Sequence, residues 1–202
     1  MKNIITIQHT QSVHHTNGMI GSWTDWELSE LGKEQAKLIG ERLSVELKDK
    51  QYVMYSSDLL RAKQTAEIIA NFLSIEPVYT DVLRELNLGE AVGKSEEWAH
   101  KNTLVWMKTI DDKPFNGAES RREVWERLIP FYKRIINEPN ENVILVSHGD
   151  TLSIFNAMWI GLDVEMLNKC DLFGRAGGVS FMRENSDGKH YINRLSDLSY
   201  IR

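Results

Sequence analysis

The feature that most constrains the fold of this sequence is a set of three short apolar runs, each ending at polar residues. Residues 3–7 lead to Gln8 and His9, residues 52–55 lead to a segment that contains Arg61, and residues 143–146 lead to His148. Runs of this length, rich in β-branched and aromatic residues, are typical of buried strands in an α/β sheet. Ligands bind beyond the carboxyl ends of such strands, so we expect these polar residues to meet in one crevice.

Helical patterns separate the apolar runs. We expect a helix that opens near Ser29, and a second with Ser57 as N-cap, Asp58 in its first turn and an apolar stripe over residues 59–73. Further helices are expected at about 96–110, 119–136 and 150–160, with a short strand at 77–79. Residues 179–183 and 191–195 flank a Gly-containing turn and predict a terminal hairpin. This order predicts a three-layer α/β/α sandwich with a mostly parallel central sheet and a C-terminal hairpin.

The bulk composition is that of an ordinary globular protein. The chain has 202 residues, of which 42% are hydrophobic and 26% charged, with a net charge of -5. We therefore expect one domain over residues 1–202 and no nucleic-acid partner, since no basic face stands out. No long apolar run is visible, so no membrane partner is expected. The lone Cys170 excludes an internal disulfide, and we expect a cytoplasmic protein that is a monomer or homodimer.

The residues at the strand ends suit phosphoryl transfer. A neutral imidazole such as that of His9 can attack a phosphate monoester and hold the phosphoryl group as phosphohistidine. Arg61 can stabilise the charge on the equatorial oxygens, and His148 can add a donor from the neighbouring strand. The leaving alkoxide needs a proton, for which Glu85, after the short strand, is the candidate. The partner would be a small phosphorylated metabolite or a phosphoprotein.

The motifs, taken in order, resemble those of the histidine phosphatase superfamily, which includes the phosphoglycerate mutases. The first is Gln8-His9, followed by Leu28-Ser29-Glu30-Leu31-Gly32; the second is Ser56-Ser57-Asp58-Leu59-Leu60-Arg61-Ala62. Leu86-Asn87-Leu88-Gly89-Glu90 after Glu85, Gly117-Ala118-Glu119-Ser120 and Val146-Ser147-His148-Gly149 resemble the remaining three. The resemblance covers nearly the whole chain. The length of the chain is closer to that of the phosphatase branch than to that of the mutases, which are usually longer.

The resemblance implies a role for each matching residue. His9 would be the phosphorylated nucleophile, Glu85 the proton donor, and Arg61 and His148 the phosphate ligands. We assign further phosphate contacts to Gln8, Ser12, His15 and Gly149. The family implies no metal and no other cofactor, and the expected activity is that of a metal-independent phosphomonoesterase.

Two substitutions depart from the family's Arg-His-Gly signature. Gln8 replaces the arginine and brings no charge, and Thr10 replaces the glycine. Losing one donor to the transition state typically lowers the rate on the order of a hundred- to a thousandfold. His15, or the pair Arg121 and Arg122, could return a positive charge, although His14 and His15 are better explained as ordinary loop residues than as ligands.

These departures leave a second function open. The chain could be a catalytically weak relative that binds phosphorylated ligands as a sensor or scaffold. A phosphoglycerate mutase is the third alternative, which the short chain disfavours. The sequence does not identify the physiological ester.

Overall fold

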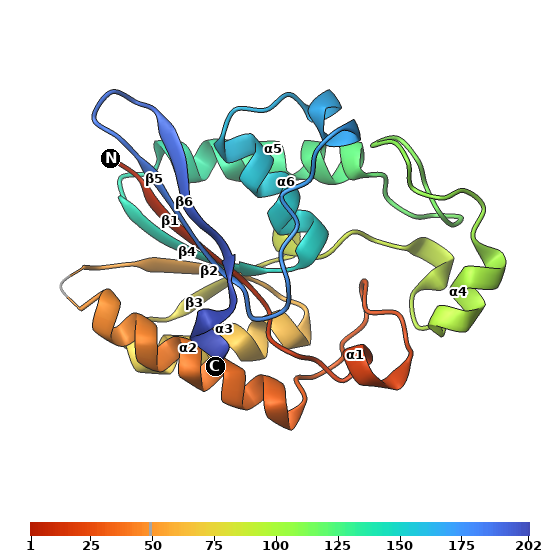
Figure 1. Ribbon diagram of the computed structural model, residues 1–202, viewed down its shortest axis with the longest axis horizontal. Coiled ribbons are helices and arrows are strands. Elements are labelled where there is room, and N and C mark those ends of the chain that lie inside the picture. Colours follow the sequence, from red (N-terminus) through yellow and green to blue (C-terminus); the bar gives the residue numbers. More distant parts are fainter. Residues whose placement is uncertain (49) are drawn as a thin grey trace.

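A computed structural model describes residues 1–48 and 50–202 as a single six-stranded sheet with helices on both faces (Figure 1). The strand order is β3-β2-β4-β1-β5-β6. The strands are β1 (Asn3–Gln8), β2 (Val53–Ser57), β3 (Pro77–Thr80), β4 (Asn142–Ser147), β5 (Val179–Glu184) and β6 (His190–Asp197). The helices are α1 (His14–Asn17), α2 (Glu30–Glu46), α3 (Leu60–Leu73), α4 (Glu96–Asn102), α5 (Arg121–Asn137) and α6 (Gly149–Trp159). Short 3₁₀ turns occupy Asp81–Leu83, Gly89–Ala91, Val164–Asn168 and Leu198–Ile201.

The pairing of the strands explains why distant motifs meet. Strands β1, β2, β3 and β4 are mutually parallel, whereas β5 and β6 form the antiparallel hairpin predicted from the sequence. Gln8 of β1 lies opposite Ser147 of β4, and Ser56 of β2 lies opposite Val146. His9 and His148 therefore leave the sheet side by side at its carboxyl edge, and the N–H of His9 donates to the carbonyl of Ser147 at 2.9 Å.

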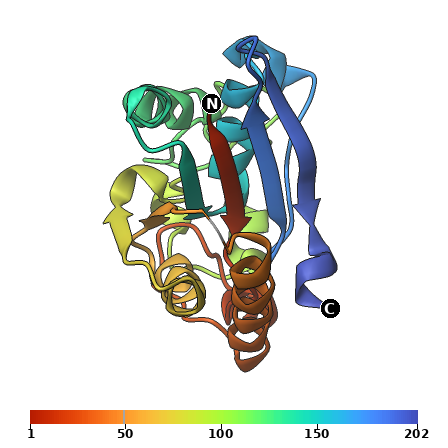
Figure 2. The same ribbon diagram turned by 90° about the vertical axis from the view of Figure 1, so that its left-hand side faces the viewer.

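Alternation along the strands divides the core into two layers. Ile4, Val143 and Leu145 pack with α5 and α6, and their sequence neighbours Ile5 and Ile144 pack with α2 and α3. Side chains of a strand point alternately to the two faces, so a strand buried on both sides reads as a continuous apolar run. Figure 2, from the end where the N-terminus lies, shows the sheet between its helices. The predicted three-layer sandwich is confirmed.

The helices predicted to start near Ser29 and at about 96, 119 and 150 begin within two residues of these positions, whereas the N-cap predicted at Ser57 is wrong. Ser29 caps α2 by accepting from the N–H of Gly32. Ser120 caps α5 in a reciprocal capping box with Glu123. Ser57 is not an N-cap, because α3 begins at Leu60 with Leu59 before it. The Ser57 hydroxyl contacts the imidazole of His148 instead, and Asp58 lies outside the helix.

The helix predicted at 96–110 is shorter, and α4 ends at Asn102. The amide of Asn102 donates to the carbonyl of Trp98, and the hydroxyl of Thr103 donates to that of Ala99. These side chains bind carbonyls at the end of the helix, where local polar groups compete with further helical turns. The loop predicted at 10–27 contains the single turn α1. No helix in the described parts of the chain is both long and apolar enough to cross a membrane.

Candidate functional site

A cavity of about 360 Å³ lies beyond the carboxyl ends of β1, β2 and β4. Its lining consists of Gln8, His9, His14, His15, Gly21, Ser22, Arg61, Glu85, Leu86, Leu88, Met107, Gly149, Asp150 and Phe173. Six of the eight residues assigned from the sequence are among them. The other two, Ser12 and His148, are fully buried and do not belong to the lining. Six separate segments of the chain thus converge, three of them at or after the ends of β1, β2 and β4, as the sequence predicts.

The imidazole of His9 is held in one tautomer by two neighbours. Its Nδ1 lies 2.8 Å from the carbonyl of Thr10, which can only accept, so Nδ1 carries the proton. The Nε–H of Arg61 donates to Nε2 at 3.2 Å, so Nε2 presents its lone pair. Burial, and then the charge of Arg61, hold the pKa of His9 well below its usual value. The imidazole is therefore neutral, as a nucleophilic nitrogen must be.

Arg61 is fixed by contacts on each of its nitrogens. Besides the bond to His9, its two terminal nitrogens donate to the carbonyls of Thr24 at 2.8 Å and Ser22 at 2.7 Å. The side chain is 1% exposed, and burial lowers its pKa to about 10, so the guanidinium stays charged at neutral pH. Each terminal nitrogen has a second N–H, which leaves a fork of donors for an anion in the cavity.

His148 has one nitrogen bonded and one without a partner. Its Nε2 lies 2.8 Å from the hydroxyl of Ser57, which also accepts from the N–H of Leu59. The hydroxyl has two acceptor lone pairs and one O–H, so its contact with Nε2 fits either tautomer of His148. Nδ1 of His148 is buried without a hydrogen-bond partner among the described residues, and the centres of the His148 and His9 rings lie 5.1 Å apart. A catalytic role is one reason for a buried polar atom without a partner.

Glu85 is bound to the amino end of α6. Its carboxylate accepts from the backbone N–H of Leu86 at 2.9 Å, of Thr151 at 3.3 Å and of Asp150 at 3.4 Å. The side chain of Asp150 lines the cavity beside it. Burial, and then the negative charge of Glu85, raise the pKa of Asp150 to about 7. Two carboxyl groups therefore face the cavity on the side of α6.

The two histidines of α1, His14 and His15, both form hydrogen bonds with Ser12. The N–H of Ser12 donates to Nδ1 of His15 at 3.2 Å, and its hydroxyl lies 2.8 Å from Nδ1 of His14. His15 is thereby set with its proton on Nε2, and its ring stacks on His9 with centres 5.5 Å apart. Burial lowers the pKa of both rings, that of His14 to about 3. Ser12 thus supports two imidazoles rather than lining the cavity.

The arginine pair weighed as a source of charge does not reach the cavity. Arg121 pairs with Asp171 at 3.0 Å and with Asp150 at 3.6 Å. Arg122 pairs with Asp111 at 2.6 Å and with Glu165 at 3.0 Å on the surface. Among the residues that line the cavity, Arg61 is the one guanidinium.

Comparison with known proteins fits this geometry. The family model described as "Histidine phosphatase superfamily (branch 1)" matches residues 4–196. The chain belongs to the histidine phosphatase superfamily. The putative phosphoserine phosphatase 2 of Hydrogenobacter thermophilus is 31% identical over 96% of this chain and 97% of its own. A phosphoglycerate mutase of Schizosaccharomyces pombe is 29% identical over 96% of this chain and 95% of its own.

Two solved structures of phosphatases have a similar fold. A mycobacterial glucosyl-3-phosphoglycerate phosphatase in complex with VO3 superposes with a TM-score of 0.82 at 23% identity, covering 97% of this chain and 99% of its own. The α-ribazole phosphatase of Shigella flexneri gives a TM-score of 0.82 at 19% identity, with 97% and 96% covered. At these identities the likeness concerns the fold.

Gln8 and Thr10, the two departures from the superfamily's first signature, both have defined neighbours in the structure. The Gln8 side chain lies between Gly149 and Gly174, where a Cβ on either glycine would come within 3.4 Å of its amide. Thr10 is fully buried with both of its polar groups paired. Its hydroxyl donates to the carbonyl of Gly32 at 2.8 Å, and its N–H donates to the hydroxyl of Thr65. The Thr10 hydroxyl, which glycine lacks, therefore binds the loop after His9 to α2, and the backbone N–H binds it to α3.

Several residues at this histidine phosphatase site were missed by sequence reasoning. The sequence predicts Ser57 only as a helix N-cap and residue 150 only as the start of a helix. Ser22 has the unusual φ of 39°, and its carbonyl accepts a hydrogen bond from Arg61. Its hydroxyl donates to the carbonyl of Leu86 and accepts from the N–H of Leu88. Asp150 had a usable signal, since it follows His148 at a strand end. No sequence pattern marked Ser22 or Phe173.

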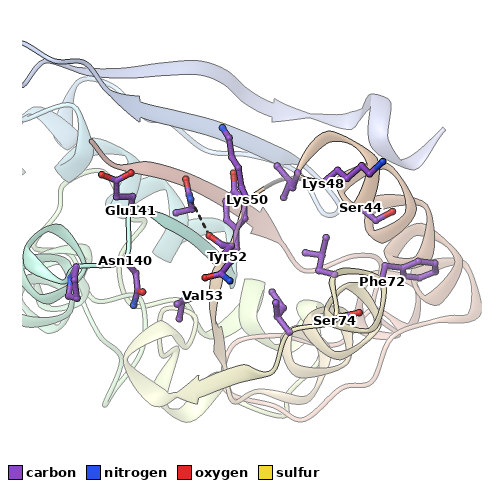
Figure 3. Close-up of a pocket in the computed structure, with 15 residues that line it drawn as sticks. Ser44, Lys48, Lys50, Tyr52, Val53, Phe72, Ser74, Asn140 and Glu141 are labelled. Carbon is purple, nitrogen blue, oxygen red and sulfur yellow. Dashed lines mark hydrogen bonds between the residues drawn. The ribbon is translucent and has the colours of Figure 1, made fainter.

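A larger cavity of about 650 Å³ lies at the opposite edge of the sheet (Figure 3). Its wall includes Tyr52 and Val53 at the start of β2 and Asn142 at the start of β4. The amide of Asn142 donates to the carbonyl of Gln51 at 3.1 Å across it. None of the motif residues lies there, so size alone does not locate the candidate site.

Proposed function

We propose that the chain is a metal-independent phosphomonoester hydrolase that acts through a phosphohistidine on His9. The observation that carries the proposal is the proton-free Nε2 of His9 beside Arg61 and the unpartnered Nδ1 of the neighbouring His148, to which we assign the ring proton. The centres of the two rings lie 5.1 Å apart. A lone pair and a guanidinium at the cavity, with a second imidazole next to them, suit a tetrahedral anion.

In the first step, Nε2 of His9 attacks the phosphorus in line with the ester oxygen. The P–N bond forms as the P–O bond to the alcohol breaks, and the proton of a carboxylic acid at Glu85 passes to the leaving oxygen. The N–H fork of Arg61 and the Nδ1–H of His148 bind the equatorial oxygens. The Nε2–H of His15 supplies a further neutral donor, since its tautomer is set by Ser12.

In the second step, water attacks the phosphohistidine. The carboxylate of Glu85 takes a proton from the water as the new P–O bond forms and the P–N bond breaks. Inorganic phosphate leaves, and Nε2 of His9 regains its lone pair. The same carboxyl group serves as acid and then as base, as microscopic reversibility of the two displacements allows.

The test is to trap the intermediate and remove the nucleophile. The protein is mixed with a ³²P-labelled phosphate ester in the presence of a chelator, quenched, and assayed for an acid-labile, base-stable label. We expect the label on His9, and we expect His9→Ala to lose both label and turnover. His100→Ala is the matched control, because this histidine lies exposed on α4 outside the cavity and should keep both.

The substitution at Gln8 favours a second candidate, a phosphate-ester binding protein of low turnover. The cavity holds one guanidinium where the family signature would provide two. Tight binding of phosphate esters with no labelled His9 and no turnover would support this candidate. Turnover that survives His9→Ala would contradict the mechanism proposed here.

A further inference from the structure

The apolar residues of the cavity lie on the side of Glu85. Leu86 directly follows Glu85, and Leu88 comes two residues later. The ring of Phe173 reaches over Gly149 at the amino end of α6, with Cζ 2.6 Å from where a Cβ on Gly149 would lie. The amide groups that bind Glu85 belong to the next two residues of that helix. Phe173 and the leucines are therefore neighbours of the proposed proton donor.

Met107 adds an apolar side chain from a different segment. It belongs to the stretch that follows α4 and lines the cavity while 38% exposed. Phe173 is 54% exposed although it also lines the cavity. Large apolar side chains left exposed at the rim of a polar cavity mark a surface that a ligand covers.

The charges in the cavity lining favour an uncharged alcohol. Arg61 is the one Lys or Arg side chain in the lining, and Glu85 and Asp150 are acids. Once Arg61 binds the phosphate, no second cation of the lining is left for a carboxylate on the alcohol, and the two acids oppose one.

We propose that Phe173, Met107, Leu86 and Leu88 form an alcohol-binding subsite that selects phosphate monoesters of uncharged, apolar alcohols. The inference rests on the proposed function, since it places the alcohol at Glu85 and the phosphate at His9 and Arg61. It assigns substrate choice to two segments, one after α4 and one after α6, that lie far apart in the sequence. Phe173 and Met107 cover the apolar part of the ester, and Leu86 and Leu88 contact it from the side of Glu85.

The test compares two stable phosphonates that differ only in the apolar group. Calorimetry measures binding of benzylphosphonate and methylphosphonate to the wild-type chain and to Phe173→Ala, Met107→Ala and Leu104→Ala. We expect benzylphosphonate to bind at least about tenfold tighter, because it buries a ring against apolar side chains. Phe173→Ala and Met107→Ala should each reduce this preference by about three- to tenfold.

Leu104→Ala is the matched control, since Leu104 is 63% exposed in the same segment as Met107 but outside the cavity lining. It should keep the wild-type preference. Equal binding of the two phosphonates, or a loss of preference in Leu104→Ala as large as in Met107→Ala, would overturn the subsite. So would a kcat/KM for 3-phosphoglycerate above that for benzyl phosphate.

The binding assay separates this inference from the proposed function. A preference for benzylphosphonate in a chain that shows no turnover and no label on His9 would leave the subsite standing and the hydrolase proposal refuted. Turnover through His9 without any such preference would refute the subsite alone.

Discussion

Arg61 donates its Nε–H to Nε2 of His9 at 3.2 Å, and both side chains are buried. The contact has two consequences for the histidine. The positive charge adds to burial in lowering the pKa of His9, which keeps the nucleophile unprotonated at neutral pH. The same contact places a cation where the equatorial oxygens of a phosphoryl group on Nε2 would lie.

Arg61→Lys should lower kcat on the order of a hundred- to a thousandfold, because an ammonium group cannot replace the planar fork. It should also lower the free energy of unfolding by about 1–3 kcal/mol, since the buried carbonyls of Ser22 and Thr24 lose their donors. Steady-state kinetics and urea unfolding measure the two effects. Arg84→Lys, at the half-buried pair with Asp58, is the control and should change kcat less than threefold.

Gln8→Arg should raise kcat about ten- to a hundredfold, because it adds one guanidinium to a site with a single one. Gln8→Lys serves as the comparison, since it adds charge without the fork and should gain less. The rates are measured on one ester under saturating conditions. If kcat does not increase in Gln8→Arg, His15 and its neighbours already perform the role of the missing arginine.

Ser57→Ala should lower kcat/KM on the order of tenfold, with the fold intact. The hydroxyl of Ser57 holds the His148 ring, and one hydrogen bond of about 1–1.5 kcal/mol corresponds to a rate change of that size. Ser56→Ala is the matched control, because the hydroxyl of this buried neighbour donates to the carbonyl of Ser57 and not to His148. Equal losses in the two variants would show that packing at the end of β2, rather than the contact with His148, is responsible.

Asp150→Asn should change how stability depends on pH. The pKa of Asp150 rises from 3.8 to about 7 in the folded chain, so the folded state binds more protons than the unfolded state between these values. The free energy of unfolding therefore decreases as pH rises through this range. The variant should match the wild type at pH 4 and be more stable than it at pH 8. Thermal unfolding at the two values measures the difference, and a variant less stable at pH 8 would refute the shift.

The sequence by itself determined that the chain forms a mostly parallel sheet with polar residues after its strands. It also identified the candidate catalytic residues, which are His9, Arg61, Glu85 and His148. These follow from apolar runs and polar strand ends, which are local patterns that any copy of the chain carries. The start of α2 at Ser29 was predictable for the same reason, because a cap acts within one turn.

Tertiary structure alone decided the chemistry between these residues. Ser57 contacts His148 instead of capping a helix, because β2 and β4 are adjacent in the sheet. The pKa of Asp150 and the place of Phe173 over Gly149 likewise depend on contacts between distant segments. Burial, charge and contact are properties of the assembled neighbours, so no window of sequence contains them.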